Sequence, residues 1–124
     1  MENIIEKNEE IRTKYETIDG KQCVLLSVKA TSPLIPLLTC IYTEFKKGVA
    51  ITISYAGMWA GHQTNKAVMY AREKLCKEDG LDFNVQMFKH FTVGKKNGDQ
   101  IEIFYCRLLP VDLSPAALKD FKDG

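Results

Sequence analysis

Apolar and polar residues alternate with a period of two along much of the chain, and five stretches are predicted to be β-strands. The stretches are Ile11 to Ile18, Gln22 to Ala30, Val49 to Tyr55, Asn84 to Gly94 and Gln100 to Leu109. Asp19-Gly20, between the first two, is typical of a two-residue hairpin turn. The first two strands are therefore expected to form an N-terminal hairpin.

Three other stretches have the spacing of helices. After Ser32 as the expected cap and Pro33 at the first helical position, apolar residues recur every three or four positions. They are Leu34, Leu37, Leu38, Ile41, Tyr42 and Phe45. A second helix is expected from Gln63 to Lys77, with Ala67, Tyr70, Ala71 and Leu75 on its apolar side. A short third helix is expected from Leu113 to Phe121.

The expected strands (β) and the first two helices (α) follow the order β-β-α-β-α-β-β. This order predicts an α+β fold, with two helices packed on one face of an antiparallel-rich sheet. No linker, repeat or low-complexity run divides the chain, so residues 1–124 are expected to form a single domain.

Charge and composition exclude some classes of binding partner. Seventeen basic and sixteen acidic residues leave a formal net charge of +1, so nucleic acid is not expected as a partner. The polar start of the chain is unlike a secretory signal, and the longest nearly uncharged run is shorter than the about 20 residues that span a bilayer. We therefore expect a cytoplasmic protein without membrane contact.

The cysteine and histidine residues lack the spacing of metal ligands. Four cysteines lie far apart and the two histidines, His62 and His90, are unrelated in position. No glycine-rich phosphate loop and no serine–histidine–aspartate set stands out. The sequence predicts no metal and no cofactor.

The last expected strand carries the candidate chemistry. If Ile101 and Ile103 face the helices, the alternation turns Glu102, Phe104 and Cys106 to the other face. Phe88, and with it His90, could join that face from the neighbouring strand. The expected result is a concave aromatic patch with one carboxylate, suited to an apolar or cationic small molecule. Alternatively, Glu102 is a solvated strand residue and Phe104 closes a dimer interface.

Tyr55 and Trp59 flank Gly57, where the third strand passes into the second helix. A loop at a sheet edge is a common position for a ring that contacts a ligand, which makes both residues candidates. Alternatively, Trp59 packs over the end of the core.

Part of the chain resembles the GyrI-like family, also called the bacterial effector-binding or SOUL-type fold. The matching segments are the run from Ile53 to Trp59, the helix from Gln63, and Ile101 to Tyr105 with Pro110-Val111 behind it. The resemblance implies a strand–helix–strand–strand repeat with a shortened first half. It also implies a cleft for apolar or cationic, drug-like molecules, with Glu102 as the acid and Tyr55, Trp59 and Phe104 as ring walls.

Three functions follow as hypotheses. The first is a stand-alone small-molecule binding protein that uses Tyr55, Trp59, Phe88, Glu102 and Phe104. The second is a hydrolase of electrophilic small molecules with Glu102 as its catalytic residue. The third is a homodimer or other protein-interaction module that docks through the aromatic face.

Overall fold

The computed structural model describes residues 11–94 and 98–112, and the fold is α+β with the predicted order of elements. The elements are β1 (Ile11–Ile18), β2 (Lys21–Val28), α2 (Leu34–Lys46), β3 (Ala50–Tyr55), α3 (Met58–Lys74), the π-helical turn η1 (Leu75–Asp79), β4 (Asp82–Val93) and β5 (Gln100–Val111). Residues 113–121, predicted to be helical, lie outside the described residues.

The N-terminal hairpin is confirmed. Strands β1 and β2 pair from Ile11 opposite Val28 to Ile18 opposite Lys21. Asp19 and Gly20 both have positive φ, at 53° and 78°. Two central residues with positive φ match the right-handed twist of the flanking strands, which is why Asp-Gly is favoured there.

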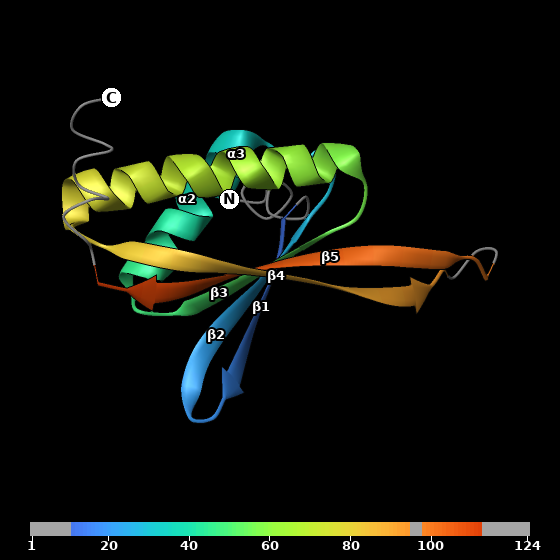
Figure 1. The fold of residues 1–124 in the computed structure, drawn as a ribbon, viewed down its shortest axis with the longest axis horizontal. Helices are drawn as coiled ribbons and strands as arrows, with labels where there is room; N and C mark the ends of the chain where they lie inside the picture. Colours follow the sequence, from blue (N-terminus) through green and yellow to red (C-terminus); the bar gives the residue numbers. More distant parts are fainter. Residues whose placement is uncertain (1–10, 95–97, 113–124) are drawn as a thin grey trace, which may run out of the picture.

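The sheet has five strands in the order β1-β2-β3-β5-β4. Strands β2 and β3 are parallel because α2 crosses over between them, and every other neighbouring pair is antiparallel. The last strand, β5, lies between β3 and β4. Figure 1 shows α2 and α3 on one side of this sheet, which confirms the predicted layering, and the other side is referred to below as the open face.

The core lies between the helices and the sheet. Strands β2 and β3 contribute fully buried residues such as Leu26 and Ile53, and α2 contributes Leu37 and Ile41. The buried side of α3 carries small residues, which let this helix lie close to the sheet: Ala60, Gly61, Thr64, Ala67 and Ala71. Tyr70 was predicted on this side, but the structure leaves half of it exposed.

Both helices begin elsewhere than predicted. The N-cap of α2 is Pro33, and the Ser32 hydroxyl instead accepts a hydrogen bond from the Lys29 amide at 2.9 Å. Helix α3 begins at Met58, five residues before the predicted start at Gln63. This start could not be recognised from the sequence, because the N-cap residue, Gly57, has no side chain that could cap the helix. It caps α3 through its backbone, with a positive φ of 86°.

The alternation in β5 is present, but the predicted assignment of its two faces is wrong. Cys106 and Leu108 are buried against the helices, paired with Ile53 and Ile51 of β3. Glu102 and Phe104 therefore share the helix side, and Ile101 and Ile103 lie on the open face. Cys106 and Leu108 meet the core, and their burial decides which face is covered.

A buried ion pair joins α3 to the start of β4. The Asp82 carboxylate is 7% exposed and accepts hydrogen bonds from Arg72 Nε at 2.7 Å, Arg72 Nη2 at 3.1 Å and the Phe83 amide at 2.7 Å. The Arg72 guanidinium holds the pKa of this carboxyl below its usual value.

We expect Asp82→Ala to lower the free energy of unfolding at pH 7 by about 1.5–3 kcal/mol, because the hydrogen bonds to a charged group are lost. The pKa of Asp82 is depressed by folding, so its contribution is present above the unfolded pKa of about 3.9 and is lost as the pH falls through the folded value. Urea denaturation of both proteins at pH 7 and at acid pH measures this. Glu73→Ala, which removes an exposed pair with Lys77, is the control with a small expected effect. A difference between Asp82→Ala and wild type that persisted in acid would contradict the assignment.

Candidate functional site: a cleft on the open face of the sheet

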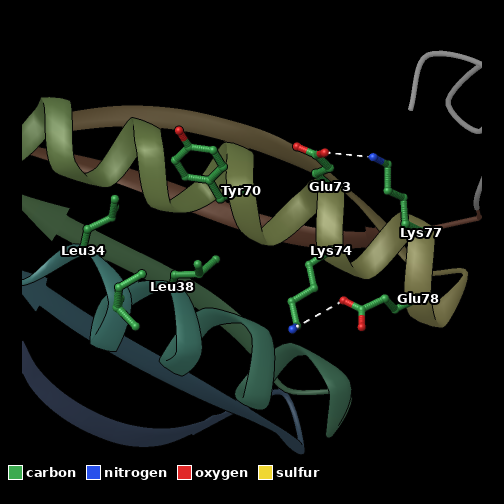
Figure 2. Close-up of a pocket in the computed structure, with 8 residues that line it drawn as sticks. Leu34, Leu38, Tyr70, Glu73, Lys74, Lys77 and Glu78 are labelled. Carbon is green, nitrogen blue, oxygen red and sulfur yellow. Dashed lines mark hydrogen bonds and ion pairs between the residues drawn. The ribbon is translucent and has the colours of Figure 1, made fainter. Parts of the chain in front are cut away.

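One hollow is a groove of about 740 Å³ between α2 and α3, shown in Figure 2. One end is apolar, with Leu34 and Leu38 of α2 and Tyr70 of α3. Its other end is charged, but these charges pair with one another: Lys77 contacts Glu73 at 3.0 Å and Lys74 contacts Glu78 at 3.4 Å. The groove therefore offers no unneutralised charge to a ligand.

A second hollow of about 410 Å³ lies where β3 passes into α3. Its wall is a stacked pair of rings, Tyr55 and Phe104, with centroids 5.6 Å apart and planes inclined by 20°. Burial raises the pKa of the Tyr55 phenol. A Cβ atom on Gly61 would lie 2.9 Å from the Tyr55 ring, so glycine is what permits the ring to lie against α3.

The third hollow is a cleft of about 450 Å³ on the open face, which we call the open-face cleft. Strand β1 forms one wall with Glu16 and Ile18, and the opposite side is formed by β4 and β5. Between them lies a mainly apolar floor. The lining residues are Glu16, Ile18, Cys23, Leu25, Ala50, Thr52, Phe88, His90, Tyr105, Arg107 and Leu109. Neither helix covers this face of the sheet (Figure 1).

Three rings and one guanidinium group form the β4–β5 side of the open-face cleft. Phe88 and Tyr105 are directly opposed in the β4–β5 pairing, and their rings stack with centroids 4.9 Å apart and planes inclined by only 4°. His90 meets both rings edge-on, with centroid distances of 5.7 and 5.5 Å. The Arg107 guanidinium carbon lies 4.8 Å from the Phe88 centroid, a cation–π contact.

The charge of Arg107 is not neutralised within the described part of the chain. Its Nε donates a long hydrogen bond of 3.5 Å to the Thr52 hydroxyl, and no carboxylate oxygen of the described residues lies within 4.0 Å of it. The one carboxylate that lines the cleft, Glu16, has its own partner, Lys14, at 3.2 Å. The aromatic side of the cleft is therefore positive.

The predicted site residues are divided between the two faces. Tyr55 and Phe104 share the hollow at the start of α3, Phe88 lies in the open-face cleft, and Trp59 is 69% exposed in the first turn of α3. Glu102 lines none of these three hollows and pairs with Lys89 at 2.8 Å. Tyr105 and Arg107 were not predicted, although the correct phase of the alternation in β5 would have put both beside Phe88.

The described residues show no metal-ligating cluster of three histidine, cysteine or acidic side chains. Burial raises the thiol pKa of Cys106 to about 11 and raises that of Cys40 as well, so both thiols are protonated near neutral pH and are poor nucleophiles. Among the described helices, none has the length and apolarity needed to cross a bilayer.

Comparison with known proteins shows the fold and no more. No family model and no curated protein matches the chain. Among solved structures, Alba from Thermoplasma volcanium has a similar fold, with a TM-score of 0.51 and 13% sequence identity, over 68% of this chain and 98% of that one. At this identity the similarity is one of fold, and it does not bear on the resemblance to the GyrI-like family.

We expect Glu102→Gln to lower the free energy of unfolding by about 1 kcal/mol or less, because the pair with Lys89 is largely exposed. Its effect should shrink further in 1 M salt, where exposed charges are screened within about 3 Å. Thermal melts in low and high salt test this. A large, salt-independent loss would indicate that Glu102 has a more demanding role than an exposed ion pair.

Proposed function

We propose that this protein binds a planar, negatively charged small molecule in the open-face cleft. The observation that carries the proposal is the stacked Phe88–Tyr105 pair beside an Arg107 guanidinium that has no carboxylate partner among the described residues. The proposal keeps the aromatic small-molecule ligand expected from the sequence. It changes the preferred charge of that ligand, because an arginine and not Glu102 lies next to the rings.

Ring contacts and charge complementarity both support this ligand class. The exposed edges and faces of aromatic side chains favour flat rings, and a guanidinium group binds carboxylate, sulfonate or phosphate oxygens through several N–H donors. The cleft volume of about 450 Å³ falls within the usual range for small-molecule sites. At roughly 0.3 kcal/mol per non-hydrogen atom, a ligand of about 20 atoms would bind with a Kd on the order of 10–100 µM.

Calorimetric titration with three matched probes tests the proposal: 2-naphthoate, neutral 2-naphthylmethanol and cationic 2-naphthylmethylammonium. We expect 2-naphthoate to bind most tightly. Arg107→Gln should weaken it by about 10-fold or more, since a hydrogen bond to a charged group contributes about 1.5–3 kcal/mol. Phe88→Leu should weaken all three probes, because each loses its ring contact.

Lys89→Gln is the matched control for Arg107→Gln. It removes one positive charge from the residue next to Phe88, but its side chain lies on the helix side of the sheet, where it contacts Glu102. Binding of 2-naphthoate should not change. Tighter binding of the cation, or equal losses in Lys89→Gln and Arg107→Gln, would refute the proposal.

A single-stranded nucleic acid is a second candidate ligand, favoured by one feature of the strand register. A cross-strand row on the open face runs from Arg12 of β1 through Ser27 and Ser54 to Tyr105 and Phe88. With strands about 4.8 Å apart, Arg12 lies about 14 Å from Tyr105 across the sheet. Bases could therefore stack on the rings while the phosphates of the same strand contact Arg12 and Arg107. The net charge of +1 counts against this ligand.

Fluorescence anisotropy with labelled oligothymidylates of 3 and 12 nucleotides separates the two candidates. If the open face binds single strands, the longer oligonucleotide binds more tightly, added salt weakens it steeply, and Phe88→Leu and Arg12→Gln both reduce affinity. Binding of 2-naphthoate with no binding of either oligonucleotide would exclude the second candidate and leave the first.

The remaining alternatives have less support. A hydrolase that uses Glu102 requires a substrate cavity at that carboxylate, and Glu102 lines none of the three hollows described above. The homodimer stays a prediction from the sequence.

A further inference from the structure

The two faces of strand β1 have different surroundings: one borders the open-face cleft and the other faces the helices. Glu16 and Ile18 line the open-face cleft, whereas Tyr15 points to the helix side. There the Tyr15 hydroxyl donates a hydrogen bond of 2.5 Å to Oε1 of Glu44 in α2. We propose that Tyr15 and Glu44 are positioning residues, a latch that holds the β1 wall of the open-face cleft in place for the ligand. This inference rests on the proposed function.

The surroundings of Glu44 make this hydrogen bond consequential. The Glu44 side chain is only 8% exposed, and its second oxygen, Oε2, is buried with no hydrogen-bond partner among the described residues. Its other neighbour is Lys47, whose Nζ lies 3.5 Å from Oε1. Burying a carboxylate with few partners is unfavourable, so the Tyr15 hydroxyl offsets a cost that arises when β1 lies over α2. Without that hydroxyl, β1 would cover an undersatisfied carboxylate.

The backbone of β1 pairs with β2 along its whole length, but few of its side chains are packed. It is one of the two edge strands of the sheet, and of its residues Ile11 alone is buried. The Tyr15–Glu44 bond lies four residues closer to the hairpin turn than Ile11, next to the residues that form the cleft wall. The pKa of Tyr15 is raised to about 12, chiefly by the hydrogen bond to Glu44, so the phenol stays protonated and can donate this hydrogen bond throughout the neutral range.

The chain contains a matched control for the latch. The Tyr42 hydroxyl donates a hydrogen bond of 2.6 Å to Oδ2 of Asp79, a second phenol–carboxylate contact. It joins α2 to η1, and neither Tyr42 nor Asp79 lines the open-face cleft. Tyr15→Phe and Tyr42→Phe therefore remove the same chemical group from the same kind of bond, but only the first change concerns the cleft wall.

The test compares wild type, Tyr15→Phe, Tyr42→Phe and Glu44→Gln in two measurements: the Kd of 2-naphthoate and the hydrogen exchange of the Glu16 to Ile18 amides. We expect Tyr15→Phe to raise the Kd about fivefold or more and to accelerate exchange in this segment at least tenfold. Tyr42→Phe should leave both values unchanged, whatever it does to stability. Glu44→Gln should stay close to wild type, because its amide oxygen can still accept the phenol hydrogen bond.

The outcomes separate the latch from the proposed function. If Arg107→Gln weakens 2-naphthoate binding but Tyr15→Phe does not, the latch is refuted and the proposed function stands. Equal effects of Tyr15→Phe and Tyr42→Phe would also refute it, since the cause would then be general stability. If 2-naphthoate does not bind wild type, the proposed function is refuted, and the positioning role is refuted with it. The hydrogen exchange measurement would still show whether the Tyr15–Glu44 bond anchors β1.

Discussion

The structure depends on the burial of one face of a five-stranded sheet under two helices. That burial is concentrated where Ile51 and Ile53 of β3 meet Leu108 and Cys106 of β5. Side chains alternate strictly between the two faces along a strand. Because these four residues face the core, the face on which each remaining residue of β5 lies is determined as well. Tyr105 and Arg107 are thereby forced onto the open face, where they meet Phe88. The position of the candidate site is thus a consequence of core packing.

The elements were predictable, but the face assignment of β5 was not. Order, layering and the Asp19-Gly20 hairpin followed from local patterns, because turn chemistry and periodicity act over only a few residues. The phase of β5 depends on which of its residues meet β3, a contact between distant parts of the chain. Ile101 and Ile103 looked like core residues by type, yet the core lies nearer the other end of that strand. The start of α3 was predicted wrongly for a different reason, because Gly57 begins the helix through its backbone conformation and not through a capping side chain.

The residues that line the open-face cleft were only partly predicted. An aromatic surface on the uncovered side of a sheet was expected, and Phe88 and His90 lie on it. The charge was expected to be negative, from Glu102, but it is positive, from Arg107. Overall composition did not indicate this, because a formal charge of +1 is a sum over the whole chain. Local sign depends on pairing: Glu16 and Glu102 each have a lysine partner, and no described carboxylate pairs with Arg107.

The central position of β5 has a consequence for how the protein is made. This strand is last in the sequence of strands, yet it lies between β3 and β4. During synthesis β1, β2, α2 and β3 leave the ribosome well before β5, so the edge of β3 that pairs with β5 has no partner until Phe104 to Leu108 have emerged. At about 5–20 residues per second, the roughly 55 residues after Tyr55 take about 3–11 seconds to add. We expect the nascent chain to expose an unpaired, apolar strand edge throughout that interval, the state in which chaperones recognise their clients.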